Sequence, residues 1–396
     1  MTIGYVIHRF PWPSETFISR EVAGLIELGE DIRIYSFERP GVEQAAKLTP
    51  QGHELMARTH YIGRGEALRA LASPSGIRTF ARARSSLRKA AAGRRLWLLA
   101  ARAAALAGHV RRDRVTQLHA HWPYATLACH LAARMAGVPY SISVHAHEVA
   151  FENAHFAACF PELSFANFCN EAAMEHLLAQ LPPEARAKTH LVYHGVDTAQ
   201  FAPGPEAAPP PPVRILSAGR LTATKGFDRL VRACAAAEER GLSVELTILG
   251  AGIEEQPLRA LADALGFGAK LHLPGWVPHD AVPGYIDASH AFCLLANTDF
   301  GDGLPNVVLE AMAAARVPIV SPLPAAGEAI THGVNGYILE SPDDVEGFIA
   351  AIAALQAHPG TARDMGLAAR QAVVERHDAA THLRRLHSLL HGGPHG

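Results

Sequence analysis

The sequence lacks closely spaced cysteines, long uncharged apolar runs and an excess of charge of either sign. Its five cysteines lie far apart without a Cys-x-x-Cys pair, which excludes a disulfide framework and a zinc cluster and predicts a reducing, cytoplasmic setting. The most apolar stretch, residues 96–110, is too short to cross a bilayer and contains Arg102. No basic segment precedes the apolar residues after Met1, so we expect no targeting signal.

Charge is nearly balanced over the whole chain. The chain contains 36 lysines and arginines and 38 aspartates and glutamates. The resulting net charge of -2 argues against a general nucleic-acid binder. Of the 396 residues, 49% are hydrophobic and 19% are charged, which excludes a disordered chain. A chain of this length predicts two domains.

A proline-rich stretch, residues 203–212, predicts a linker between these domains because it can form neither a helix nor a central strand. We expect an N-terminal domain over residues 1–202 and a C-terminal domain over residues 213–376. The last segment, residues 377–396, has helical spacing and is expected to return to the N-terminal domain.

In both halves short apolar runs alternate with segments of helical spacing, and this pattern predicts parallel sheets in an α/β fold. The strands are expected at residues 3–8, 32–36, 116–120, 140–144, 165–169 and 189–193, and then at 213–219, 244–249, 270–273, 291–295 and 317–321. Two doubly wound, Rossmann-like domains would then face each other across a cleft, with ligands beyond the carboxyl ends of their strands.

The first candidate site follows the first strand of the second half. Gly219 and Gly226 free the backbone for a tight loop, and Arg220 and Lys225 place two cations between them. A guanidinium holds phosphate oxygens in a bidentate fork, and an ammonium adds a compact charge. The loop suits a diphosphate without a metal ion; a surface loop with two solvated cations is the alternative.

The second candidate site combines an acidic residue, a short loop and the start of a helix. Its members are Asp302, Gly303, Leu304, Pro305, Asn306, Val307 and Glu310. Pro305 suits the first position of a helix, whose free amides would bind an anion. Glu310 lies about one and a half turns further on. Its carboxylate could accept two ribose hydroxyls, or it could only compensate the helix dipole.

In the first half, the loop formed by Ser14, Glu15 and Thr16 follows the first strand. A nicotinamide-binding domain would carry Gly-x-Gly-x-x-Gly at this place, and its absence argues against a dehydrogenase.

Two pairs of histidines follow other strands of the first half. His145 and His147 come directly after residues 140–144, at the edge where such sheets bind ligands. His119 and His121 could be two metal ligands, but the sequence offers no third one, so a structural role is favoured for them.

The Gly-Arg-x4-Lys-Gly loop at 219–226 and the run 303–313 (GLPNVVLEAMA) resemble the donor site of the retaining GT-B glycosyltransferases of glycosyltransferase family 4. In the first half, residues 10–18, 119–122 (HAHW) and 143–148 (SVHAHE) are similar to the colanic acid and exopolysaccharide branch of that family. The similarity spans essentially the whole chain. It implies a GT-B fold in which the N-terminal domain binds the acceptor and the C-terminal domain binds a nucleotide sugar.

The resemblance implies a hexosyltransferase of exopolysaccharide or cell-surface polysaccharide biosynthesis. It would transfer a sugar with retention from a UDP- or GDP-linked donor to a glycan or lipid-linked acceptor, without a metal ion or another cofactor. Arg220 and Lys225 would stabilise the departing diphosphate, and Glu310 would bind the ribose. Asp302 would contact the donor sugar, although the family usually has the longer glutamate at this position.

The resemblance also implies that His145 acts near the donor sugar, and that His147 and the loop of Ser14, Glu15 and Thr16 face the acceptor or a phosphate. Two alternatives stay open. One is a nucleotide-sugar epimerase of the same fold, and the other is a non-catalytic protein that binds a sugar nucleotide or a membrane surface.

Residues 64–114 carry 12 arginines and one lysine against Glu66 and Asp113. Leucines, a phenylalanine and a tryptophan lie between them. Basic helices with apolar faces are typical of membrane surfaces, so we expect peripheral contact with anionic inner-leaflet lipids. The alternative is a solvated helical face whose arginine stems pack on the protein. The segment lacks the aromatic pattern of a nucleic-acid module.

Overall fold

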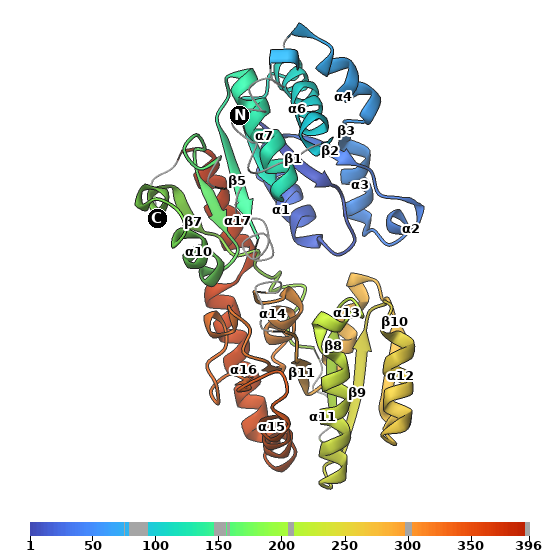
Figure 1. The fold of residues 1–396 in the computed structure, drawn as a ribbon. Coiled ribbons are helices and arrows are strands. Elements are labelled where there is room, and N and C mark those ends of the chain that lie inside the picture. The colour runs from blue at the N-terminus through green and yellow to red at the C-terminus, as the bar shows by residue number, and fades with distance from the viewer. Residues whose placement is uncertain are drawn as a thin grey trace. The chain divides into compact units, whose positions relative to one another are not determined.

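The structure is a computed structural model that describes residues 1–74, 76–78, 94–145, 156, 159–204, 210–297 and 303–392. It divides into two compact units (Figure 1). Unit 1 comprises Met1–Tyr193 and Leu383–Gly396, and unit 2 comprises His194–His382. The first boundary therefore precedes the proline-rich stretch, of which residues 205–209 lie outside the described residues.

Unit 1 is built on a parallel sheet with the strand order β3-β2-β1-β4-β5-β6-β7. The strands are β1 (Thr2–Arg9), β2 (Asp31–Glu38), β3 (Thr59–Tyr61), β4 (Gln117–His121), β5 (Tyr140–Val144), β6 (Ala166–Phe168) and β7 (Thr189–Leu191). All residues of β4 and β5 are buried. Strands buried on both faces are expected where helices cover a parallel sheet on both sides.

The described helices of unit 1 alternate with these strands. They are α1 (Thr16–Glu27), α2 (Val42–Ala45), α3 (Pro50–Arg58), α4 (Arg64–Leu71), α6 (Arg94–Arg112), α7 (Pro123–Ala136) and α10 (Glu171–Leu178). In α1 the buried residues Ile18, Val22 and Leu25 follow the spacing of one helical face. Amphipathic helices of this kind pack their apolar stripe on the sheet.

The C-terminal helix α17 (Ala379–Leu390) ends in unit 1 (Figure 1, red). Leu386 and Leu390 belong to the same hydrophobic cluster as Ile3 of β1. Gly24 of α1 allows the close approach, since a Cβ at this position would lie 2.4 Å from a methyl carbon of Leu383. The last helix thus completes the apolar core of unit 1.

Unit 2 contains a second parallel sheet, with the strand order β10-β9-β8-β11-β12-β13. The strands are β8 (Val213–Ala218), β9 (Val244–Leu249), β10 (Leu271–Gly275), β11 (Ala291–Leu294), β12 (Val317–Val320) and β13 (Tyr337–Ile338). The described α-helices are α11 (Phe227–Glu239), α12 (Glu255–Ala264), α13 (Val282–Asp287), α14 (Asn306–Ala313), α15 (Val345–Ala357) and α16 (Pro359–Arg376). Both units are therefore of the predicted α/β class.

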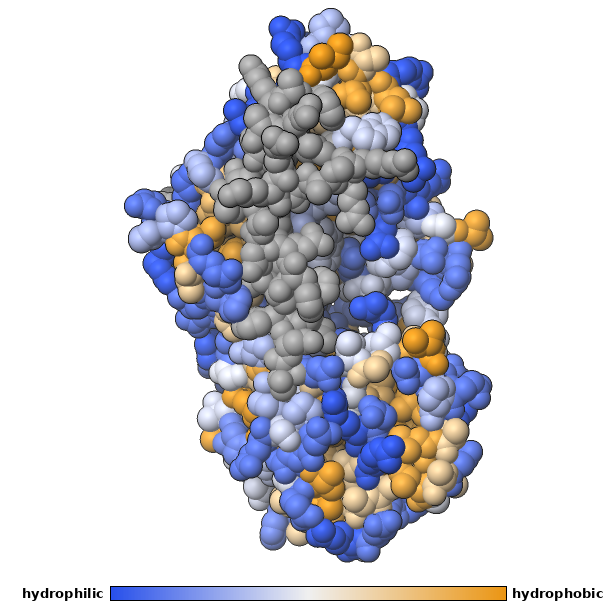
Figure 2. Space-filling view, viewed as in Figure 1, coloured by the Kyte–Doolittle hydropathy of each residue, from blue (hydrophilic) through white to orange (hydrophobic). Residues whose placement is uncertain are grey.

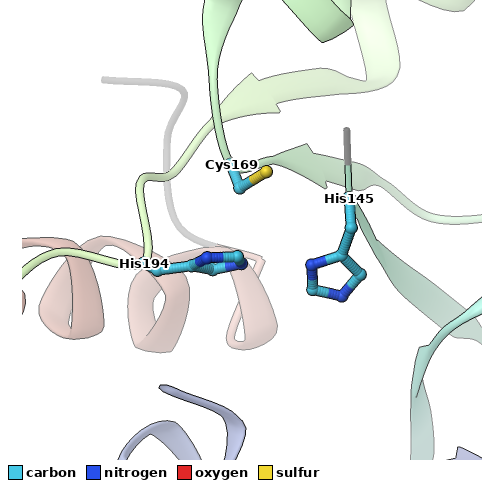
Figure 3. Close-up of side chains that lie close together, drawn as sticks. All are labelled: His145, Cys169 and His194. Atoms are coloured by element: carbon cyan, nitrogen blue, oxygen red, sulfur yellow. The ribbon is translucent and has the colours of Figure 1, made fainter. Parts of the chain in front are cut away.

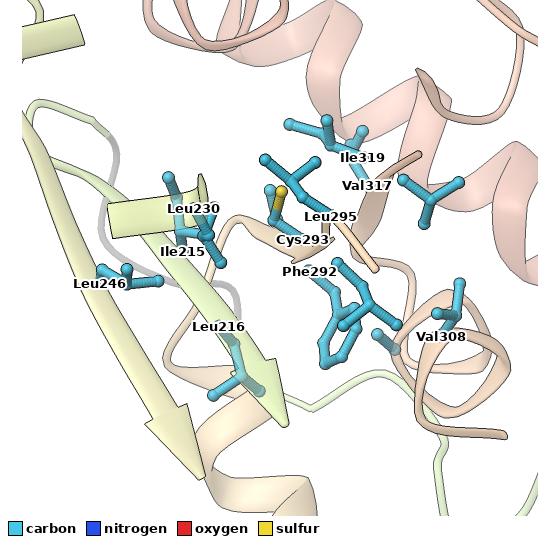
Figure 4. Packing of buried hydrophobic residues seen from close by; sticks show 14 of the residues in the cluster. Ile215, Leu216, Leu230, Leu246, Phe292, Cys293, Leu295, Val308, Val317 and Ile319 are labelled. Carbon is cyan, nitrogen blue, oxygen red and sulfur yellow. The ribbon is translucent and has the colours of Figure 1, made fainter. Parts of the chain in front are cut away.

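The core of unit 2 lies between the sheet and its helices (Figure 4). Ile215 and Leu246 extend from neighbouring strands, and Leu230 of α11 and Val308 of α14 pack against the sheet. These side chains are at most 1% exposed. Such packing fixes the carboxyl ends of the strands, from which the loops of the candidate site leave.

None of the described helices combines the length and the apolar character needed to cross a membrane. Hydrophilic residues cover most of the described surface in view, and hydrophobic residues gather in small patches, one of them over α4 (Figure 2). Leu68 of α4 is 48% exposed and Ile77 is 62% exposed. Arg102 of α6 is instead buried, and its guanidinium donates to the Phe37 carbonyl at 3.2 Å. Residues 79–93 of the basic segment lie outside the described residues.

Candidate functional site

In unit 2 the chain changes direction across the sheet between β8 and β11. From β8 it runs outward through β9 and β10, then crosses to β11 and continues through β12 to β13. At such a switch point the loops after neighbouring strands leave on opposite faces of the sheet, which creates the place where parallel α/β sheets bind ligands. The two sequence motifs of the second half follow β8 and β11.

The loops after β8 and β11 contact each other directly. The Asn297 amide donates to the Thr224 carbonyl at 3.0 Å, and the Arg229 guanidinium donates to Asn297 Oδ1 at 2.7 Å. Gly226 has a φ of 65°, and a Cβ at this position would lie 1.9 Å from the Leu295 carbonyl oxygen. Glycine is therefore required here, and it brings the two motifs together.

The two predicted cations lie on the loop after β8. The Gly219 amide donates to the carbonyl of Leu249, the last residue of β9, at 2.9 Å, and the Leu221 amide donates to the Ala251 carbonyl in the loop after β9 at 3.1 Å, which holds the backbone. Arg220 is exposed, and its guanidinium makes no hydrogen bond or ion pair with any residue that the structure describes. Lys225 is half-buried, and its side chain runs back over Gly219. Arg220 is thus available to an anion at the switch point.

The helix α14 begins one residue later than expected, with Pro305 at its N-cap instead of at its first helical position. Pro305 precedes the first helical residue, Asn306, and its carbonyl accepts from the Val308 amide at 3.0 Å. No side chain of a described residue caps this helix. Gly303 is buried, and Leu304 and Val307 are half-buried. This arrangement presents the first backbone amides of α14 at the carboxyl edge of the sheet, where an anion can accept them.

Glu310 is the most unusual side chain of this site. It is 4% exposed, and its Oε1 receives a hydrogen bond from His279 Nε2 at 3.2 Å. Its other oxygen, Oε2, is buried without a hydrogen-bond partner among the described residues. A buried carboxylate oxygen without a donor is unfavourable, so a ligand hydroxyl would satisfy it.

Asp302 and His147 cannot be placed, since residues 298–302 and 146–150 lie outside the described residues. The predicted contacts of these two side chains therefore stay predictions.

Unit 1 has its own switch point between β1 and β4. The loop after β1 holds Ser14, which is exposed, and Glu15 and Thr16, which are half-buried. Trp122 follows β4, and its Nε1 donates to Glu15 Oε2 at 3.1 Å. Trp122 has a φ of 73°, a strained conformation for a bulky residue. Backbone strain of this kind gathers at functional sites.

A chain of hydrogen bonds runs inward from this edge of unit 1. His145 is 4% exposed, and its Nε2 lies 3.3 Å from His121 Nδ1. The opposite nitrogen of His121, Nε2, lies 2.9 Å from Glu21 Oε1, which also accepts the Tyr5 hydroxyl at 2.9 Å. His121 Nε2 donates to Glu21, and His121 Nδ1 and His145 Nε2 share a single proton between them.

Glu21 is ionised in this chain. Burial alone would raise the pKa of Glu21, but the charge and hydrogen bond of His121 outweigh it and lower the pKa to about 2. The side chain is 14% exposed. A carboxylate held in this way fixes the orientation of His121 and, through it, that of His145.

Aromatic rings hold His145 from its other sides. The Trp122 ring stacks on it with centroids 4.2 Å apart, and the Phe17 ring lies at 5.5 Å. The Cys169 thiol follows the neighbouring strand β6, with its Sγ within 4.8 Å of a ring nitrogen of His145 (Figure 3). The ring of His145 therefore has one defined position at the carboxyl edge of β5.

His119 is completely buried, and both ring nitrogens have partners, Ser141 Oγ at 2.8 Å and Ser143 Oγ at 2.9 Å. Its neighbour His121 lies close to Glu21, which supplies the third potential metal ligand that the sequence did not show. The hydrogen bonds of His119 to two serines nevertheless support a structural role for this side chain.

Sequence reasoning missed Glu21 and His279. Glu21 lies between Ile18 and Leu25 at helical spacing, and a charged residue on the apolar face of a helix is a detectable signal. His279 lies in a loop after β10, where only its place beyond the carboxyl end of a strand could have indicated it.

Comparisons with known proteins agree with this geometry. Residues 200–372 match the family model of glycosyl transferases group 1. The chain is 27% identical over 365 residues to the protein named as the colanic acid biosynthesis glycosyltransferase WcaL of Escherichia coli K12, covering 87% of this chain and 88% of that protein. It is 31% identical over 183 residues to the amylovoran biosynthesis glycosyltransferase AmsK of Erwinia amylovora, covering 45% and 44%.

Solved structures show the fold over the whole chain. The crystal structure of HepE from Anabaena in complex with UDP has a TM-score of 0.75 at 15% identity, covering 99% of this chain and all of that one. Sucrose-phosphate synthase from Thermosynechococcus elongatus has a TM-score of 0.75 at 15% identity, covering 99% and 98%. These likenesses confirm the predicted GT-B fold.

Proposed function

We propose that this chain is a glycosyltransferase of exopolysaccharide biosynthesis, because residues 200–372 match the family model of glycosyl transferases group 1. Its homologues named for colanic acid and amylovoran biosynthesis support this assignment. The observation that carries the donor site is that the exposed Arg220 and the buried carboxylate of Glu310 both lie beyond the strands that flank one switch point of unit 2. The substrate is a nucleotide-diphosphate sugar, and the product is an extended glycan or a glycosylated lipid-linked acceptor.

Arg220 and Lys225 bind the diphosphate, and their charges stabilise it as it leaves. Glu310 accepts the ribose hydroxyls with its otherwise unpartnered Oε2, while His279 holds Oε1. The amides at the start of α14 bind a phosphate or sugar oxygen. Asp302 keeps the contact to the donor sugar that the family resemblance implies.

We infer a retaining transfer of a hexose without a metal ion. The bond between the anomeric carbon and the diphosphate oxygen breaks, and the acceptor oxygen bonds to the anomeric carbon from the same face. The acceptor proton moves to the departing phosphate oxygen. Arg220 and Lys225 supply the positive charge that a metal ion would otherwise provide at the diphosphate.

His145 is assigned to the reacting sugar, and His147 with the loop of Ser14, Glu15 and Thr16 to the acceptor or a phosphate. Glu21 and His121 act as positioning residues, because they fix the tautomer of His145.

The donor site is tested by thermal shift with UDP, GDP, ADP, dTDP and NAD, each with and without EDTA. The HepE structure was solved with UDP and with UDP-glucose, so uridine nucleotides come first. Stabilisation by one nucleoside diphosphate that persists in EDTA supports the proposal. A response to NAD alone, or to no nucleotide, contradicts it. Donor turnover that needs no acceptor and returns an epimerised nucleotide sugar would favour the epimerase.

Replacing Glu310 with alanine should remove the preference for ribonucleotides. Wild type should bind a nucleoside diphosphate at least about tenfold more tightly than its 2′,3′-dideoxy analogue, since the hydroxyl bonds to a charged group are each worth about 1.5–3 kcal/mol. The variant should bind both equally, as measured by calorimetry. The control is Asp280→Ala, because the carboxylate of Asp280 is exposed to solvent and is not the buried group assigned to the ribose. This variant should keep the preference of wild type. A preference that survives in Glu310→Ala would contradict the ribose assignment.

Replacing Glu21 with glutamine should lower transfer by about 10- to 100-fold, the usual effect of removing a group that orients a functional histidine. The glutamine side chain keeps the shape of Glu21, but it lacks the negative charge that orients the His121 ring through Nε2. The readout is the pH profile of kcat, whose histidine limb should shift in Glu21→Gln. If kcat of Glu21→Gln is instead reduced by the same factor at every pH, and a smaller folded fraction accounts for this reduction, Glu21 does not act as a positioning residue.

We place the enzyme in the cytoplasm, with peripheral contact to anionic inner-leaflet lipids. The wide spacing of the five cysteines, without a Cys-x-x-Cys pair, is the sequence feature behind this placement. Exposed Leu68 and Ile77 lie among exposed arginines of the same segment, Arg64, Arg69 and Arg78. Co-sedimentation with anionic but not neutral vesicles, lost at high salt, tests this contact.

A further inference from the structure

Two histidines at the C-terminal end of α17 point at a single carboxylate of unit 1. His387 lies in the last turn of α17, and His391 follows its last residue, with its amide donating to the His387 carbonyl at 3.2 Å. His387 Nε2 lies 2.8 Å and His391 Nε2 lies 2.6 Å from Glu30 Oε1. The two rings have centroids 4.6 Å apart. One ligand atom from each of the three side chains lies within 4.8 Å of the others. A His-x3-His pair on a helix with a facing carboxylate is a common donor set for transition metals.

The carboxylate of Glu30 is held in place and only partly satisfied. Its side chain is 7% exposed, and Oε2 is buried without a hydrogen-bond partner among the described residues. The Glu30 amide donates to the Leu25 carbonyl at 3.0 Å, which fixes the turn between α1 and β2. A fixed carboxylate whose second oxygen has no donor among the described residues can take a cation as a further partner.

We propose that Glu30, His387 and His391 bind a divalent transition-metal ion of the Zn²⁺ class. In a tetrahedral site with bonds of about 2.0–2.1 Å, ligand atoms lie about 3.3 Å apart. The observed nitrogen–oxygen distances of 2.8 Å and 2.6 Å need to widen by only a fraction of an ångström. His387 and His391 are 31% and 42% exposed, so an ion can enter and keep water as its fourth ligand.

The ion at this site is structural. Glu30 directly precedes β2, so it lies at the amino edge of the sheet, whereas the switch point of unit 1 lies at the carboxyl edge. The metal would link the end of α17 to the turn between α1 and β2 and thereby fasten the last helix to unit 1. This role is independent of the proposed transfer reaction.

A second group of the same composition, His60, Glu66 and His109, supplies the matched control. Its carboxylate is 32% exposed, against 7% for Glu30, and its histidines come from two elements, β3 and α6, instead of from one chain segment with His-x3-His spacing. Replacing His60 removes one potential ligand there and leaves the α17 group unchanged.

The test uses the full chain without an added histidine tag, stripped with EDTA and titrated with Zn²⁺ against a chromophoric chelator. We expect one ion per chain, with a dissociation constant raised at least about tenfold in His391→Ala and in Glu30→Gln and unchanged in His60→Ala. Thermal midpoints measured in EDTA show that each variant is folded. Added Zn²⁺ should raise the midpoint of wild type and His60→Ala only.

Any of three results overturns the assignment. These are no binding of Zn²⁺ to wild type, binding that His391→Ala and Glu30→Gln leave intact, and binding that His60→Ala removes. Because His391 is exposed near the end of α17, its replacement is expected to leave the apo fold unchanged. Nucleotide binding measured in parallel separates this result from a failure of the proposed donor site.

Discussion

Replacing Arg220 with alanine should slow sugar transfer by about 10²- to 10³-fold while the protein stays folded. Removing one preorganised donor from a developing negative charge costs about 3–4 kcal/mol of transition-state stabilisation. The guanidinium lies on the loop after β8, exposed and without a protein partner among the described residues. Its loss therefore breaks no contact that supports the fold, and the whole effect should appear in substrate turnover.

The measurement is kcat and kcat/KM for release of the nucleoside diphosphate, with the thermal midpoint as the check on folding. Arg232→Ala is the matched control, because Arg232 is an exposed arginine on the neighbouring helix α11. Arg220→Lys keeps the charge but loses the bidentate fork, so its rate should lie between wild type and the alanine variant. If Arg220→Ala and Arg232→Ala transfer sugar at equal rates, the loop after β8 is a solvated surface loop and Arg220 does not stabilise the departing diphosphate.

The parallel sheets could be predicted because buried strands are continuous apolar runs. The eleven stretches expected from the sequence all coincide with strands, while β3 and β13 were missed. These two strands have three and two residues at sheet edges, which is too short to show a period. They form because a neighbouring strand offers free backbone groups, and this is not visible in local sequence.

The candidate site was predicted less completely, for a physical reason. The loop of Arg220 and the segment before Glu310 are short motifs, so the spacing of residues shows them. The hydrogen bond between Glu310 and His279 and that between Glu21 and His121 join segments that are far apart in the sequence. Only the folded chain shows that Glu310 keeps one buried oxygen without a donor.

Acid should destabilise unit 1 through His119, and His119→Gln should reduce this sensitivity. Burial lowers the pKa of His119 from 6.5 to about 3 in the folded state. Below pH 6.5 the unfolded chain therefore binds a proton that the folded chain does not. The free energy of unfolding then falls by about 1.4 kcal/mol per pH unit, or about 4–5 kcal/mol in all by pH 3. Glutamine keeps hydrogen bonds to Ser141 and Ser143 but cannot be protonated.

Glu21 acts in a lower pH window and can be separated from His119. Its folded pKa of about 2 lies below the usual 4.5, so its stabilising contribution is complete above pH 4.5 and is lost as the pH falls toward 2. In urea unfolding between pH 7 and pH 5 the contribution of Glu21 therefore stays nearly constant, while that of His119 changes. Tryptophan fluorescence can follow the unfolding of unit 1, because Trp12, Trp97 and Trp122 belong to this unit.

The pH slope of His119→Gln should be smaller than that of wild type by about 0.7 proton on average over this range, that is about 1 kcal/mol per pH unit, and by nearly one proton close to pH 5. His53→Gln, at an exposed position of α3, should match wild type and serves as the control. Equal slopes for His119→Gln and wild type would mean that His119 is protonated in the folded protein. Its two serine partners, Ser141 and Ser143, would then both accept hydrogen bonds from the ring.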